Sequence, residues 1–279
     1  MNQKKQAALV LSGGGALGAA HIGALRALEN LDFDFDFYAG VSAGALICAL
    51  AACGRRSAEI QRILEEVNFF SLVFDFTRMP YALLRGNKVK ERLASVFEDR
   101  TFADLNRPLF IGCTDFSTGE RVILNRGSIT EAVRASLSVP VLFEPFYHAQ
   151  EERWLVDGGL TQNFPLDIAI QHYPGTAILG IDVTASVLQP LDFSQRKSRN
   201  KARHLTMAAQ RAIHILLLNQ QQSLPPDPRV SRIVPDLRGY TALDVFRLAE
   251  IIEAGEKAVH EQHDDLLAKN NMPAMIGEP

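Results

Sequence analysis

The chain has 279 residues, of which 47% are hydrophobic and 22% are charged, and its formal net charge is −3. This length suffices for the core of one large α/β domain, and the slightly negative charge disfavours a dedicated nucleic-acid-binding protein. The odd number of cysteines, without metal-ligand spacing, disfavours a disulfide framework or a zinc site, so we expect buried, reduced thiols in a cytoplasmic protein. These cysteines are Cys48, Cys53 and Cys113.

The chain starts with lysines and a short apolar run, which superficially resembles a signal peptide. The run at residues 7–12 is too short for the apolar part of such a peptide, and three glycines follow it. It therefore predicts a strand that is buried on both faces. No stretch reaches the length of a membrane-spanning helix, so we expect any membrane contact to be peripheral, at the inner face of the membrane.

Three consecutive glycines, Gly13, Gly14 and Gly15, end this strand. From Gly18 to Leu31 the apolar residues recur at helical spacing, so a helix is expected directly after the glycine turn. The backbone N–H groups of such a turn can come very close to a negatively charged oxygen. The pattern predicts an oxyanion hole, provided that a nucleophile lies beside it.

A serine nucleophile is predicted at Ser42. A short strand around residues 35–39 leads into Gly40-Val41-Ser42-Ala43-Gly44, and small apolar residues then predict a helix over 45–52. The pattern G-x-S-x-G between a strand and a helix is typical of a nucleophile elbow, in which larger side chains at the two glycine positions would collide. Because neighbouring parallel strands end side by side, we expect the glycine turn next to Ser42.

The same glycines support a rival interpretation. Gly13, Gly15 and Gly18 satisfy G-x-G-x-x-G, and acidic residues near the position expected for ribose binding follow: Asp32, Asp34 and Asp36. Against a dinucleotide site, the second strand ends in the serine turn, which a dehydrogenase does not need. The nucleophile elbow is the favoured interpretation.

The next part of the chain predicts two helices around an aromatic segment. An amphipathic helix is expected over residues 55–68, with Ser57 as its N-cap, and a short charged helix over 87–98. Residues 69–86 between them are rich in phenylalanine. They form either a cap packed on the domain or an apolar lid that admits acyl chains or touches a membrane.

A candidate for the acidic partner of Ser42 follows further along the chain. Residues 107–127 predict two strands joined by a turn, and Ser128 then caps a helix that ends before Pro140. The short strand at residues 154–156 leads into Asp157-Gly158-Gly159. An aspartate at a strand end beside two glycines is where we expect the partner of Ser42.

The last part of the chain carries a helix up to Tyr173, a buried strand over residues 176–183 and a basic stretch over 192–203. That stretch is either a solvated face or a contact for anionic headgroups. A helix over 205–220, a strand in "SRIVPDL" and a closing helix over 243–268 follow. Without repeats or a linker, the chain is expected to be a single domain over residues 1–279.

Four motifs, in this order, resemble those of bacterial patatin-like phospholipases. They are "GGGALG" at 13–18, "GVSAG" at 40–44, "RASLSVPVLFEP" at 134–145 and "DGGLTQNFP" at 157–165. The resemblance reaches from residue 7 to about 183. It leaves the C-terminal third without a matching motif, and we expect a helical extension over about 193–279.

The resemblance implies a three-layer α/β/α fold with a mainly parallel sheet, and a lipid acyl hydrolase with a Ser–Asp dyad. Ser42 would be the nucleophile, Asp157 the general base and Gly13–Gly15 the oxyanion hole, with a lipid or acyl-ester substrate and neither metal nor cofactor. One departure is Leu17, where many relatives carry a basic residue.

Several alternatives stay open at this stage. His148, in a strand near Asp157, could complete a triad, whereas His21 is expected to pack beneath the elbow. Asp115 is expected in a turn, and Asp182 behind the site. The motifs fit a hydrolase, an acyltransferase that uses the same acyl-enzyme, or a non-catalytic regulatory protein on a hydrolase fold. They do not choose among phospholipid, lysophospholipid and neutral glyceride.

Overall fold

The computed structural model describes residues 4–66, 75–77, 82–187, 215, 219 and 226–262. Its strands are β1 (Lys5–Leu11), β2 (Phe33–Val41), β3 (Ala82–Leu84), β4 (Leu109–Asp115), β5 (Arg121–Leu124), β6 (Val141–Phe143), β7 (Phe146–His148), β8 (Arg153–Asp157), β9 (Ile178–Ile181) and β10 (Val230–Ile233). Its α-helices are α1 (Ala19–Asn30), α2 (Ala43–Ala52), α3 (Ser57–Glu65), α5 (Asn87–Phe97), α6 (Ile129–Ser136), α7 (Leu166–His172) and α9 (Leu248–Glu261). Short 3₁₀ helices are η1 (Gly15–Gly18), η2 (Phe102–Asp104) and η3 (Gly158–Leu160).

The main sheet is mixed, with the strand order β10-β9-β1-β2-β4-β8-β7, and β5 pairs with β4 as well. The strands from β10 to β4 in this order are parallel to their neighbours, whereas β5, β8 and β7 pair antiparallel. Strands β3 and β6 form a separate two-stranded sheet. The expected mainly parallel sheet is confirmed.

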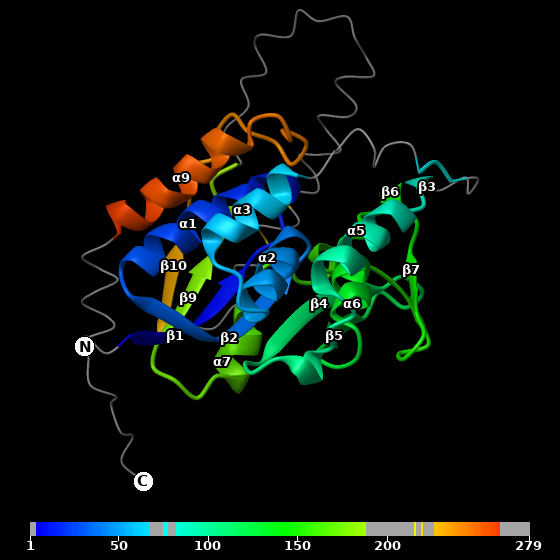
Figure 1. The fold of residues 1–279 in the computed structure, drawn as a ribbon, viewed down its shortest axis with the longest axis horizontal. Coiled ribbons are helices and arrows are strands. Elements are labelled where there is room, and N and C mark those ends of the chain that lie inside the picture. Colours follow the sequence, from blue (N-terminus) through cyan, green and yellow to red (C-terminus); the bar gives the residue numbers. More distant parts are fainter. Residues whose placement is uncertain are drawn as a thin grey trace, which may run out of the picture.

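Strand β1 is buried on both faces, as its continuous apolar run predicts. Leu9 and Leu11 belong to the larger core cluster with residues of α1, α2 and α9, whereas Ala8 and Val10 pack with residues of α7. Successive side chains of a strand point to opposite faces, so each face of the sheet has its own helical cover. Figure 1 shows α1, α3 and α9 on one side of the sheet and α7 on the other, which confirms the three layers.

The C-terminal part of the described chain belongs to these layers. Helix α9 packs so closely on α1 that a Cβ on Gly23 would lie 1.8 Å from the Ile252 carbonyl oxygen, and one on Gly255 would lie 1.9 Å from that of Ala20. Strand β10 extends the main sheet beyond β9. Residues 226–262 therefore add an edge strand, which overlaps the strand expected in "SRIVPDL", as well as a helix.

Two local expectations were wrong. Ser57 is the first residue of α3 rather than its N-cap, because its hydroxyl donates a hydrogen bond of 2.8 Å to the Glu29 carboxylate instead of capping the helix. The closing helix begins at Leu248 rather than at 243, because residues 241–247 form turns. The basic stretch 192–203, most of the aromatic segment 69–86 and, except for residues 215 and 219, the helix expected over 205–220 lie outside the described residues.

Within the described part of the chain, every helix is too short or too polar to span a bilayer.

Candidate active site

Ser42 occupies the sharp turn between β2 and α2. Its backbone has φ 54° and ψ −123°, a conformation that costs an L-residue free energy. A Cβ on Gly40 would lie 2.6 Å from the Gly44 backbone, and one on Gly44 would lie 2.4 Å from the Leu11 carbonyl oxygen. Both glycines are therefore required sterically, as the elbow pattern predicts, and helix α2 directs its positive N-terminal end toward the serine.

The sheet brings Asp157 to this turn by an end-to-end arrangement of two strands. Along one edge of β4, Val41 of β2 lies opposite Gly112, and Asp157 of β8 lies opposite the next residue, Cys113. Strand β5 occupies the other edge of β4, opposite the same residues. Strands β2 and β8 run in opposite directions, so their C-terminal ends meet and place Ser42 next to Asp157.

Asp157 is buried and its pKa is raised from 3.8 to about 6. Burial is the largest cause, because it penalises the charged carboxylate. Two hydrogen bonds oppose the shift, one from the Ser42 side chain and one of 2.7 Å from the Gly159 backbone N–H. A carboxylate that titrates near pH 6 is a stronger base than an exposed aspartate and is still ionised at neutral pH.

Ser136, the last residue of α6, connects the turn at Ser42 to strand β4 by two hydrogen bonds. Its hydroxyl accepts a hydrogen bond of 2.8 Å from the Ser42 backbone N–H and donates one of 2.7 Å to the Gly112 carbonyl. The side chain is fully buried, so neither partner has access to water. Ser136 was not predicted individually as a site residue, although it lies within the motif at 134–145. Its signal was the small polar residue in an otherwise apolar helix face.

Replacing Ser136 with alanine is expected to cost about 1–3 kcal/mol of unfolding free energy, because two buried backbone groups lose their partner. We also expect a roughly tenfold slower reaction of Ser42 with a serine-directed phosphonate, because the elbow is then less rigidly held. Urea unfolding and the labelling rate measure the two effects. Ser95→Ala, which removes an exposed hydroxyl bonded to the Arg92 carbonyl, is the matched control.

The glycine turn lies beside Ser42, as expected. A Cβ on Gly13 would lie 3.2 Å from the Ser42 Cβ. The Gly13 N–H already donates a hydrogen bond of 3.0 Å to the Asn163 carbonyl, which makes it unsuitable as an oxyanion donor. Among the described residues, nothing accepts a hydrogen bond from the N–H groups of Gly14, Gly15 or Ala43, the residue after the nucleophile.

A buried polar chain supports the glycine turn from behind. The Asn163 side chain donates hydrogen bonds to the Gly13 carbonyl at 3.4 Å and to the Thr184 hydroxyl at 3.3 Å. Thr184 in turn donates to the Asp182 carboxylate at 2.9 Å from both its backbone and its hydroxyl. Asp182 lies behind the site, as predicted. Asn163 was missed, although it belongs to the motif that starts at Asp157.

Neither of the two histidines near the site is placed as a catalytic base. His148 lies opposite Arg153 in the β7–β8 pairing, four residues along the strand from Asp157, or roughly 13 Å. His21 is buried beneath the turn, where its Nε2–H donates a hydrogen bond of 2.9 Å to the Ser12 carbonyl. Burial lowers the pKa of His21 to about 4, so it is neutral.

The rival dinucleotide site is excluded by the strand register. Strands β1 and β2 are parallel, with Gln6 opposite Asp34 and Leu11 opposite Gly40. The acidic residues therefore lie at the start of β2, whereas the glycine turn follows the end of β1. The two groups lie at opposite ends of these parallel strands. Asp34 instead accepts two hydrogen bonds of 2.9 Å from Arg107.

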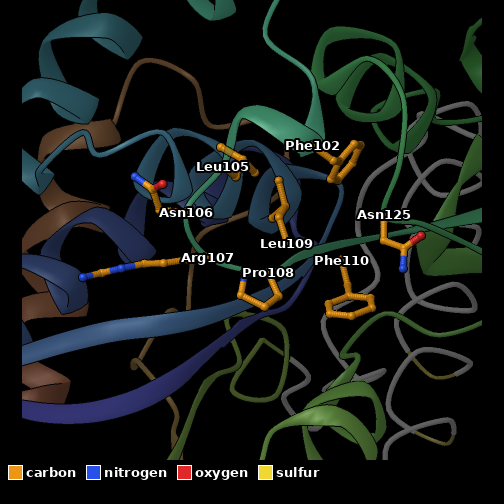
Figure 2. Close-up of a pocket in the computed structure, with 8 residues that line it drawn as sticks. All are labelled: Phe102, Leu105, Asn106, Arg107, Pro108, Leu109, Phe110 and Asn125. Atoms are coloured by element: carbon orange, nitrogen blue, oxygen red, sulfur yellow. The ribbon is translucent and has the colours of Figure 1, made fainter.

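Figure 2 shows a pocket of about 350 Å³ with the side chains that line it. It lies at the start of β4, whereas Ser42 and Asp157 meet beside Gly112 and Cys113, further along that strand. Its lining includes Phe102, Leu105, Asn106, Arg107, Pro108, Leu109, Phe110 and Asn125. The pocket is separate from the candidate site.

A family model described as patatin-like phospholipase matches residues 9–170, more than half of the chain. The chain belongs to the patatin-like phospholipase family. The matched region contains Ser42, Asp157 and all four motifs on which the resemblance was based.

Curated relatives of this patatin-like chain are considerably longer. An uncharacterized NTE family protein of Mycobacterium bovis is 29% identical over 264 residues, which cover 90% of this chain and 45% of that protein. Human patatin-like phospholipase domain-containing protein 6 is 32% identical over 181 residues, 63% of this chain and 13% of that protein. The chain thus spans less than half the length of these relatives.

A solved structure shares the fold. The structure of VipD from Legionella pneumophila matches with a TM-score of 0.64 over 94% of this chain and 67% of that chain, at 16% sequence identity. At this identity the likeness establishes the patatin-like fold alone.

Proposed function

We propose that this protein is a serine lipid acyl hydrolase that cleaves fatty-acyl esters through an acyl-enzyme on Ser42, with Asp157 as the general base. The observation that carries the proposal is the hydrogen bond of the Ser42 side chain to a buried carboxylate whose pKa is raised to about 6. Family membership supports the same reaction class.

In the proposed first half-reaction, Asp157 removes the hydroxyl proton as the Ser42 oxygen attacks the ester carbonyl. The tetrahedral intermediate carries a negative oxygen, for which Gly14, Gly15 and Ala43 have available N–H groups. The protonated Asp157 then gives its proton to the leaving alcohol or lysolipid, and the acyl group remains on Ser42.

In the proposed second half-reaction, Asp157 takes a proton from water, which attacks the acyl-enzyme. The fatty acid leaves as the proton returns to the Ser42 oxygen. An aspartate can serve both steps because burial brings its pKa close to neutrality, so little driving force is lost in either direction.

A lipid substrate is supported by the names of the relatives, which include phospholipases and the Drosophila melanogaster neuropathy target esterase sws. Peripheral contact with a membrane belongs to the proposal, because lipids of this kind reside in bilayers.

A reducing compartment, such as the cytoplasm, is supported by the free cysteines. Burial raises the pKa of the Cys48 and Cys113 thiols, which keeps them protonated.

The proposal predicts covalent labelling of the wild-type protein by a fluorophosphonate at one site. Intact-mass measurement should show a single adduct, and peptide mapping should place it on Ser42, because this serine is hydrogen-bonded to a buried carboxylate with a raised pKa beside the glycine turn. Phosphatidylcholine and lysophosphatidylcholine carrying labelled acyl chains, supplied with and without an alcohol acceptor, then identify the product.

Free fatty acid as the main product supports hydrolysis, whereas transfer of the acyl chain to the alcohol would assign the protein to the acyltransferases. A folded protein that neither reacts with the probe nor releases acyl chains would contradict both and favour the regulatory alternative.

A further inference from the structure

Large apolar side chains are exposed on segments that border the dyad, at the edge of the sheet where the parallel strands end. We call six of these side chains the apolar rim, and their exposed fractions range from 40% to 77%. The rim consists of Leu83, Val139, Val141, Leu160, Leu243 and Phe246.

One part of the rim surrounds Asp157. The Asp157 backbone N–H donates a hydrogen bond of 3.0 Å to the Ser138 carbonyl. Val139 is the next residue in the chain, and Val141 follows two residues later. Leu160 lies three residues after Asp157, in the 3₁₀ helix η3. Strand β3 adds Leu83 to this group, because β3 pairs with β6, in which Val141 is the first residue.

The other part of the rim borders the glycine turn. The Ala16 N–H donates a hydrogen bond of 2.9 Å to the Ala242 carbonyl, and a Cβ on Gly15 would lie 2.6 Å from the same oxygen. Leu243 is the next residue, and Phe246 follows in the same turn-rich segment. The rim therefore borders both the base and the expected oxyanion donors.

Backbone strain accompanies one rim residue. Val141 has φ +71°, which is rare for a β-branched residue, and its side chain is 70% exposed. Such strain is typical of functional positions, and here it presents an apolar side chain to solvent without any gain in core packing.

Two charged side chains beside the rim have partners within their own segment. Asp244 accepts hydrogen bonds from the Thr241 backbone and hydroxyl, and Arg247 forms an ion pair of 2.7 Å with Glu250. The rim residues themselves carry no charge. This composition suits the acyl region of a bilayer better than an anionic headgroup or a charged protein surface.

We propose that the apolar rim is the surface by which the protein docks on a lipid bilayer, with its side chains inserted below the headgroups. The inference rests on the proposed lipid substrate. Docking in this orientation turns the buried dyad toward the membrane, so an acyl ester can reach Ser42 without crossing bulk water. Because the rim is uncharged, docking requires no anionic lipid.

The test is flotation of the wild-type protein with vesicles of ether-linked phosphatidylcholine, which contains no ester to cleave. We expect binding that changes less than twofold between low and high salt. Val141→Ser and Leu243→Ser are each expected to lower the partition coefficient roughly tenfold. They should also lower the ratio of turnover on vesicle phospholipid to turnover on a soluble short-chain ester.

Tyr147→Ser is the matched control, because it removes an exposed aromatic ring from the edge strand β7, outside the rim. It should partition like the wild type, and thermal unfolding of all three variants verifies that they are folded. Binding that needs anionic lipid, or rim variants that partition normally, would overturn the proposal. The proposal would also be overturned if the wild-type protein formed a dimer that did not bind vesicles and if the rim variants were monomeric.

Failure of the proposed function is distinguishable from failure of the rim. Vesicle binding by a protein that does not cleave soluble esters would retain the rim and reject the hydrolase. Cleavage of soluble esters without vesicle binding would do the reverse.

Discussion

Replacing Ser42 with alanine is expected to lower kcat/KM for acyl esters by more than about 10⁴-fold, because the proposed mechanism forms the acyl-enzyme on the Ser42 oxygen. The substitution removes one oxygen and leaves the turn intact, so the far-UV circular dichroism spectrum should not change. Initial rates with a soluble ester, measured with enough protein to detect the residual activity, give the size of the loss.

A second substitution at the same position separates chemistry from strain. Ser42→Gly should be equally inactive, yet more stable than Ser42→Ala by roughly 1 kcal/mol, because glycine adopts φ 54° without the steric cost that a Cβ carries. Urea unfolding of the two variants measures the difference. Residual activity above about 1% in either variant would show that Ser42 is not the nucleophile.

The elbow and its surroundings were predictable because local sequence determines them. Gly40 and Gly44 are required by contacts within the turn and with the end of β1. Because these contacts exclude larger side chains, they produce the G-x-S-x-G pattern, which is visible in the sequence. The alternation of strands and helices up to residue 183 was likewise visible in apolar periodicity. Asp157 could be singled out because it ends a short apolar strand beside two glycines.

The parts that could not be predicted depend on pairing between distant segments. Nothing local indicates that β8 meets β2 end to end on β4, which is the arrangement that joins the two catalytic candidates. The bond between the Gly13 amide and the Asn163 carbonyl is also long-range, so Gly13 was grouped with its neighbours as an oxyanion donor. The same limit explains why β10 could be predicted as a strand without its place in the sheet.

Asp157→Asn is expected to lower kcat/KM by about 10²–10⁴-fold, the range that a general base contributes. The kcat/KM of the wild type should depend on pH around the pKa of Asp157, whereas that of the variant should not. Only the ionised carboxylate can accept the Ser42 proton, and its pKa is raised from 3.8 to about 6. Below pH 6 the wild-type kcat/KM should therefore fall tenfold per pH unit, and above it the rate should level off.

The same substitution should stabilise the fold at neutral pH. Because the folded-state pKa of Asp157 lies above its unfolded value, ionisation of the buried carboxyl destabilises the native state. This cost is absent below pH 3.8, grows as the pH rises to about 6 and is then constant, at about 2–3 kcal/mol for a shift of this size. Asparagine carries no such cost, and its side-chain oxygen can still accept a hydrogen bond from the Gly159 N–H.

The unfolding free energies of the wild type and of Asp157→Asn should therefore coincide near pH 4 and diverge toward pH 7, with the variant the more stable. The contrary result would be a constant difference in unfolding free energy between the two proteins at every pH, together with a wild-type kcat/KM that is independent of pH between 5 and 8. It would show that Asp157 is an ordinary ionised carboxylate and not the base of the reaction.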